Sequence, residues 1–285
     1  MPVESILSAA EEAVRRGRVS HFQGPLHVGV DLGTAYTMIM VLDGALQPLT
    51  AAYQFAQVVR DGVVVDFMGA IDLVKRLKAD VESRLGVELT SAASAYPPGI
   101  SLAEVRAVAY VLEGAGMICT RLIDEPTAAN ALLGVKDGAV VDVGGGSTGI
   151  AVIEDGRVVY TADEPTGGTH FTLVIAGAKG ISFEEAESLK LDANVQPELF
   201  PLIRPVMEKV ATIIQRHLRG LQVPSITLVG GAAAFPGFTD VVAEITGIPT
   251  AAPSRPMFVT PIGIAMLHEA AAGDGSPIPT KTLRG

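Results

Sequence analysis

Two stretches of the chain alternate apolar positions with polar or small ones, as strands with one buried face do. Residues 26–42 and 139–153 show this alternation, and they end at Asp43-Gly44 and Asp155-Gly156 respectively. Asp-Gly is a favoured turn between antiparallel strands. We therefore expect each stretch to be strand structure that ends in a hairpin turn.

The two stretches also share a residue pattern. Val30-Asp31-Leu32-Gly33 in the first matches Val141-Asp142-Val143-Gly144 in the second. An internal repeat of this kind implies two lobes built on one plan. A threonine stands six residues after each of the two aspartates, and an isoleucine stands eight residues after it. Thr37 therefore corresponds to Thr148 in the repeat, and Ile39 to Ile150.

Helical periodicity and turn signals fill the rest of the chain. Apolar residues three or four apart predict helices, and short apolar runs bounded by Gly or Pro predict strands. Because the two kinds of element alternate, the pattern favours an α/β protein with mixed sheets. Helices are expected at residues 1–19, 71–85, 101–112, 183–190 and 201–218, after Thr127 and after Pro261, and further strands at residues 92–96, 117–123 and 226–229.

The repeat and the helices suggest a domain plan. An amphipathic helix and a linker occupy residues 1–25, and this helix either packs on its own lobe or docks a partner. Residues 26–138 with 259–272 are expected to form the first lobe, residues 139–258 the second, and residues 273–285 a flexible tail.

Composition narrows the class of protein. Of the 285 residues 48% are hydrophobic and 18% charged, which is enough apolar material for two cores. The net charge of −10 opposes binding to a nucleic acid backbone. No charge-free apolar run is long enough to span a bilayer. The single cysteine, Cys119, is expected to be a buried apolar residue, and a chain without an internal disulfide suits the cytoplasm.

An aspartate and glycines at the start of a hairpin offer two kinds of chemistry. The carboxylate can hold Mg²⁺, which prefers oxygen ligands, and the glycines let backbone N–H groups approach phosphate oxygens. Asp31-Leu32-Gly33-Thr34 and residues 142–147 both have this form, so the two together can grip a triphosphate. The chain has no Gly-Lys-Ser/Thr, which excludes a P-loop, and Ser147 does not stand in a nucleophile elbow. The five histidines are scattered, so no histidine is assigned to a metal.

Four segments resemble the nucleotide motifs of the superfamily of actin, sugar kinases and DnaK-type heat-shock chaperones. Residues 28–34 resemble its first phosphate motif, 122–129 its first connecting motif, 140–153 its second phosphate motif and 227–232 its adenosine motif. The resemblance implies an actin-like ATPase fold, in which two duplicated ribonuclease H-like lobes with mixed sheets enclose a nucleotide cleft.

Within that superfamily, nearly the whole chain resembles the ethanolamine utilization EutJ family. The segments that carry this resemblance are residues 59–67, 96–99, 162–168, 181–187 and 258–261. The family is encoded with bacterial microcompartment systems and is described as chaperone-like. The resemblance therefore implies ATP or ADP as ligand, and a microcompartment enzyme or shell protein as partner.

The superfamily resemblance also implies roles for individual residues. Asp31 and Asp142 would organise Mg²⁺, and Glu125 would help to position the attacking water. Glu187 and Lys190, one helical turn apart, would meet the ribose and adenine. The phosphates would be contacted by Gly33, Thr34, Gly144, Gly145, Gly146, Ser147, Gly167, Gly168 and Thr169, and the adenosine by Gly230 and Gly231.

The chain departs from the chaperones at two basic residues. Ala232-Ala233-Ala234 stands where the chaperones place an arginine near the base. Residues 47–60, where the chaperones' first-lobe lysine would lie, offer only Arg60. Because losing a charged catalytic group lowers rates by orders of magnitude, any ATP hydrolysis is expected to be slow and Mg²⁺-dependent.

Three functions fit these observations. The first is an ATP-driven chaperone-like factor that assembles or maintains microcompartment enzymes through closure of its lobes. The second is an actin-like filament or a nucleotide-bound scaffold. The third is a small-molecule kinase, which would need a substrate pocket and a catalytic base that the sequence does not show.

Overall fold

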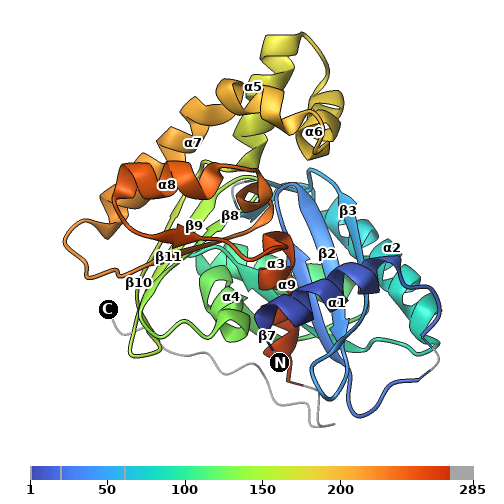
Figure 1. Ribbon diagram of the computed structural model, residues 1–285. Coiled ribbons are helices and arrows are strands. Elements are labelled where there is room, and N and C mark those ends of the chain that lie inside the picture. Colours follow the sequence, from blue (N-terminus) through green and yellow to red (C-terminus); the bar gives the residue numbers. More distant parts are fainter. Residues whose placement is uncertain (1, 20, 61, 270–285) are drawn as a thin grey trace.

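Two five-stranded mixed sheets, each with helices on it, form the frame of the protein (Figure 1). The computed structural model describes residues 2–19, 21–60 and 62–269. The expected tail at residues 273–285 lies outside the described residues, and the boundaries of the two lobes stay a prediction.

The first sheet has the order β3-β2-β1-β6-β7. Strands β1, β2 and β3 are antiparallel neighbours, whereas β6 and β7 continue parallel to β1. A short hairpin of β4 (Val59–Arg60) and β5 (Val63–Val64) follows β3. The sheet strands are β1 (His27–Leu32), β2 (Tyr36–Leu42), β3 (Pro48–Phe55), β6 (Ser91–Tyr96) and β7 (Ile118–Asp124).

The second sheet repeats the plan of the first, with the order β10-β9-β8-β11-β12. The repeated threonines hold equivalent places, because Thr37 pairs with Leu32 and Thr148 pairs with Val143, and both are fully buried. The predicted duplication and α/β class are therefore confirmed. The strands are β8 (Gly138–Val143), β9 (Thr148–Glu154), β10 (Arg157–Glu164), β11 (Ile226–Val229) and β12 (Thr250–Ala251).

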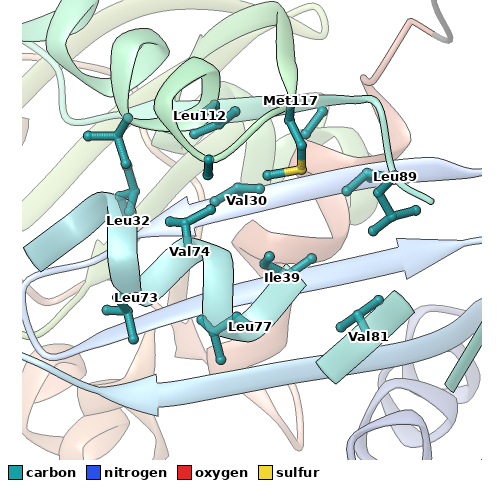
Figure 2. Close-up of a cluster of buried hydrophobic side chains, with 14 of the residues drawn as sticks. Val30, Leu32, Ile39, Leu73, Val74, Leu77, Val81, Leu89, Leu112 and Met117 are labelled. Carbon is teal, nitrogen blue, oxygen red and sulfur yellow. The ribbon is translucent and has the colours of Figure 1, made fainter. Parts of the chain in front are cut away.

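Each sheet packs its own helices into a core. Helix α2 (Phe67–Leu85) places Leu73, Val74, Leu77 and Val81 on the first sheet (Figure 2). Helix α3 (Leu102–Gly114) begins at the predicted capping box of Ser101 and Glu104. The helices of the second lobe are α5 (Gly168–Lys179), α6 (Phe183–Leu191), α7 (Gln196–Leu218) and α8 (Phe238–Thr246).

Two helices cross between the sheets. Helices α4 (Glu125–Leu133) and α9 (Val259–Met266) share a buried cluster with residues of β2, β8 and β11. They pack so closely that a Cβ built on Gly263 would lie 1.7 Å from the carbonyl oxygen of Ala128. The first lobe and the second lobe, meaning each sheet with its own helices, are joined through this crossing.

The N-terminal helix α1 (Val3–Arg15) packs on the protein itself. Leu7 and Ala10 are fully buried, in a cluster with residues of β2, β3 and α9. Glu11 accepts a hydrogen bond from Arg255 at 2.6 Å. Of the two alternatives for this helix, the structure shows packing against its own chain. It ends four residues earlier than the predicted end at residue 19.

Some predicted boundaries are wrong for local reasons. Residues 26–42 are strand structure that ends in a hairpin turn at Asp43-Gly44, as expected, but they form two strands with a further turn at residues 33–35. Helix α7 begins at Gln196, with Pro197 in its first turn, and continues through Pro201 and Pro205, so the predicted start at Pro201 is wrong. Helix α9 begins at Val259, before Pro261, because proline is tolerated in a first turn. Cys119 is buried, as expected, and the described residues include no helix long and apolar enough to cross a membrane.

Candidate functional site

A cavity of about 220 Å³ lies between the two lobes. The ends of β1 and β8, the start of α4, helix α6 and the glycines after β11 line it. All the residues predicted for the nucleotide site line this cavity, except Gly167 and Thr169. Their individual roles toward a ligand stay predictions.

The two repeated hairpins have the same local geometry. Gly33 N–H donates to the carbonyl oxygen of Tyr36, and Gly144 N–H donates to that of Ser147, both at 3.1 Å. Each bond closes the turn directly after the aspartate of its strand. The turns therefore present Asp31 and Asp142 at equivalent places in the two lobes.

The hairpins touch each other. A Cβ on Gly145 would lie 2.6 Å from Ala35 Cβ, and a Cβ on Gly146 would lie 2.6 Å from Thr34 Oγ1. Any larger residue at these glycines would push the two hairpins apart. The glycines are thus required for close approach of the lobes, in addition to the phosphate contact predicted for them.

The segment of Gly167, Gly168 and Thr169 supports the second hairpin. Gly168 N–H donates to Gly144 O, and Thr169 N–H donates to Gly145 O, both at 2.8 Å. These two N–H groups are therefore already engaged with the second hairpin. Phosphate contact by this segment stays a prediction.

Three carboxyl groups line the cavity, of which Asp142 is buried and Asp31 and Glu125 are half-buried. Burial, with a smaller contribution from the charge of Asp142, raises the pKa of Asp31 to about 7. Burial followed by the charges of Asp142 and Asp31 raises the pKa of Glu125 well above its usual range. Burial also raises the pKa of Asp142, although a hydrogen bond from Thr260 opposes this shift. A bound cation would relieve the repulsion among these groups.

The carboxyl groups suit Mg²⁺ that is also bound by phosphate and water better than they suit a metal ion held by protein side chains alone. Within residues 2–19, 21–60 and 62–269, no three His, Cys, Asp or Glu side chains come together in a metal-binding group. Mg²⁺ usually takes only one or two protein carboxylates and completes its shell with phosphate oxygens and water. Asp31 and Asp142 suit that arrangement.

Glu187 and Lys190 form a largely buried ion pair in the cavity lining. Lys190 Nζ lies 2.6 Å from Glu187 Oε2, and Thr172 Oγ1 donates to the same oxygen at 2.6 Å. Burial lowers the pKa of Lys190, and the charge of Glu187 opposes that shift. Of the described residues that line the cavity, Lys190 is the only basic one. Arg60 is exposed on β4 and does not line the cavity.

Gly230 is required by Asp142. It has a φ of +86°, and a Cβ built on it would lie 2.2 Å from Asp142 Oδ1. Thr260 of α9 donates to the other carboxylate oxygen, Asp142 Oδ2, at 2.5 Å. The glycine therefore serves the carboxylate as well as the predicted contact with adenosine.

Several residues of the cavity lining were not predicted from the sequence. Tyr36 follows Thr34 by two residues and contacts Glu187, and Thr260 stands within the family segment at residues 258–261. Tyr36 and Thr260 stand next to recognised motifs, and this proximity in sequence is the feature that could have identified them as residues of the cavity. The remaining missed residues of the lining are mostly apolar, such as Met38, Tyr53, Leu191 and Met257.

Comparison with known proteins extends these observations. A family model described as type IV pilus assembly protein PilM matches residues 99–261. The ethanolamine utilization protein EutJ of Salmonella typhimurium is 43% identical over 242 residues, 85% of either chain. The crystal structure of EutJ from Carboxydothermus hydrogenoformans aligns with a TM-score of 0.88 and 44% identity, over 93% of this chain and 97% of that one.

A more distant structure shares the fold alone. MreB 5 of Spiroplasma citri bound to AMPPNP aligns with a TM-score of 0.70 and 17% identity, over 86% of this chain and 96% of that one. The predicted actin-like ATPase fold is therefore confirmed.

Proposed function

The chain belongs to the EutJ family, which has the actin-like ATPase fold, and from this premise we propose that it binds Mg–ATP in the cavity between its lobes. Closure of the lobes on ATP would switch a chaperone-like activity. Its client would be an enzyme or shell protein of an ethanolamine-utilization microcompartment in the cytoplasm.

The observation that carries nucleotide binding is the meeting of the duplicated hairpins at one cavity. Both hairpins close through the same backbone bond, and both bring an aspartate to the same group of buried carboxyls. A structural role alone does not require repelling carboxyl groups to be buried together, since that arrangement destabilises the fold. A divalent cation with phosphate is the ligand that makes it favourable.

Each end of the cavity suits one part of the nucleotide. Asp31 and Asp142 would hold the metal, and the glycines of the hairpins would face phosphate. Glu187 and Lys190 would meet the ribose and base, next to Gly230 and Gly231. Glu125, whose raised pKa suits it to share a proton with water, would orient a water near the phosphates.

Hydrolysis is proposed to be slow. The phosphoryl group gathers negative charge during transfer, and enzymes of this type neutralise that charge with basic side chains and metal. Lys190 is the only basic residue among the described ones of the lining, and it is already paired with Glu187. The nucleotide would therefore act mainly as a ligand that sets the lobe arrangement.

A filament or scaffold is the second candidate, and the position of β10 at the edge of its sheet, among the described residues, favours it. This eight-residue strand is the edge strand of its sheet, next to β9, and its residues Val158 and Val159 are exposed. An uncovered edge strand can pair with another chain. Sedimentation of the protein with Mg–ATP separates the two candidates, since a filament pellets and a switch that acts on a client does not.

Calorimetric titration of Mg–ATP tests the proposed function. We expect saturable binding that Asp142→Ala abolishes and that Asp72→Ala, an exposed carboxylate on α2, leaves unchanged. Co-purification with and without ATP should then recover different partners. A folded wild type that does not bind Mg–ATP would contradict the proposal, and identical partners in both conditions would remove the switch.

A further inference from the structure

Tyr36 of the first lobe and Glu187 of the second contact each other across the cavity. Tyr36 begins β2 directly after the first hairpin turn, and its hydroxyl donates to Glu187 Oε1 at 3.4 Å. Burial, followed by the charge of Glu187, raises the pKa of Tyr36. The phenol therefore keeps its proton and stays a donor to the carboxylate.

The other oxygen of Glu187 is fully engaged within the second lobe. Oε2 accepts from both Thr172 and Lys190. Within the described part of the chain, only Tyr36 donates to Oε1. Oε2 is thus held within the second lobe, whereas Oε1 takes its hydrogen bond from the opposite lobe.

A group of aromatic rings holds the Tyr36 hydroxyl in place. Tyr36 packs edge-to-face on Phe55 with 5.5 Å between ring centroids, and Phe55 stacks on Phe183 of α6 at 6.2 Å and 28°. Phe183 precedes Glu187 by four residues, so the two share a face of α6. Figure 1 shows α6 above the ends of β2 and β3. Removal of the hydroxyl alone would leave this ring packing intact.

We propose that Tyr36 is a positioning residue that orients Glu187 toward the ribose hydroxyls of the bound nucleotide. The proposal rests on the function proposed above, in which Glu187 meets the ribose. A carboxylate that accepts from sugar hydroxyls needs one fixed orientation. Because the fixing bond crosses from one lobe to the other, ribose recognition requires closed lobes. Tyr36 also stands directly after the hairpin proposed to contact phosphate. It therefore connects that hairpin to Glu187, the residue proposed to contact the ribose.

Tyr36→Phe tests this role with two ligands. Affinities are measured by calorimetry for Mg–ATP and for Mg–2′,3′-dideoxy-ATP, which lacks the ribose hydroxyls. We expect the variant to bind ATP roughly fivefold to tenfold more weakly, the usual effect of losing one hydrogen bond. Affinity for the dideoxy nucleotide should stay within about twofold, since it makes no ribose contact to lose. Tyr110→Phe, at an exposed tyrosine of α3, is the matched control and should change neither affinity.

The outcomes separate this role from the proposed function. If the wild type binds ATP and Tyr36→Phe loses no affinity, or loses equal affinity for both nucleotides, the role of Tyr36 is overturned. The proposed function is unaffected by either outcome. A wild type that binds neither nucleotide would overturn both. As a second test, adding Tyr36→Phe to Glu187→Gln should weaken ATP binding by less than about twofold, because Tyr36 acts through Glu187. Additive losses would contradict that coupling.

Discussion

Thr260 donates a hydrogen bond of 2.5 Å to Asp142 Oδ2, and both residues are buried. Thr260 lies in the first turn of α9, and Asp142 lies near the end of β8. The bond therefore ties the helix that crosses between the lobes to a carboxylate of the cavity. It also opposes the rise in the pKa of Asp142 that burial causes.

Replacing Thr260 by valine removes this donor and keeps the shape of the side chain. The carboxylate of Asp142 then loses its one side-chain hydrogen bond in the described structure. We expect the free energy of unfolding at pH 8 to fall by about 1.5–3 kcal/mol, the usual cost of an unpaired buried charged group. Urea denaturation measures this change. Thr260→Ser keeps the hydroxyl and should retain most of the stability, whereas an undiminished stability of Thr260→Val would show that the hydrogen bond to Asp142 contributes nothing.

The local part of the site could be predicted from the sequence, and the part between lobes could not. Asp31, Asp142 and their glycines stand in a repeated pattern, so their equivalence was visible along the chain. The bond of Tyr36 to Glu187 joins residues 151 positions apart, and its existence depends on the packing of α6 over the first lobe. No local periodicity carries that information.

The fold shows the same division. The duplicated strands and the capping box at Ser101 follow from short-range pattern. The start of α7 does not, because tertiary packing of its apolar stripe sustains a helix that contains Pro201. The side on which α1 packs was likewise left open, since an amphipathic stripe fits either its own sheet or a partner.

Asp31→Asn should stabilise the protein in the absence of ligand. Burial and the charge of Asp142 both disfavour the ionised form of Asp31, so a neutral amide of the same size relieves both. We expect the free energy of unfolding at pH 8 to rise by about 1–3 kcal/mol. Mg–ATP binding should be lost in the same variant. A less stable variant in thermal or urea unfolding would show that Asp31 has a structural role beyond ligand binding; Asp72→Asn is the matched control at an exposed site.

Gly263→Ala should disrupt the crossing of α4 and α9. The added methyl group would overlap the carbonyl oxygen of Ala128, and backbone cannot yield as a flexible side chain does. We expect a loss of about 3 kcal/mol or more in the free energy of unfolding. Gly177→Ala in α5, where a Cβ meets nothing within 4 Å, should instead raise stability by about 0.5 kcal/mol. Circular dichroism during urea titration measures both variants, and equal effects at the two glycines would refute the steric argument.

His268 should make the stability of the protein depend on pH. Its ring is buried, Nδ1 accepts from Val28 N–H at 3.2 Å, and Nε2 lies 3.1 Å from Ser91 Oγ. These partners suit a neutral ring that donates to Ser91. Burial first, and then the nearby charge of His27, lowers the pKa of His268 to about 4 from an ordinary value of 6.5.

Between pH 6.5 and about 4 the unfolded chain takes up a proton at this histidine and the folded chain does not. The contribution of His268 is therefore present above pH 6.5 and is lost as the pH falls toward 4, by about 2–3 kcal/mol in total. In His268→Asn the side-chain oxygen can still accept from Val28, but nothing titrates. The difference in unfolding free energy between wild type and variant should thus shift in favour of the variant as the pH falls from 7 to 4.5. A constant difference for His268→Asn across this range would mean that the ring is not held neutral in the fold.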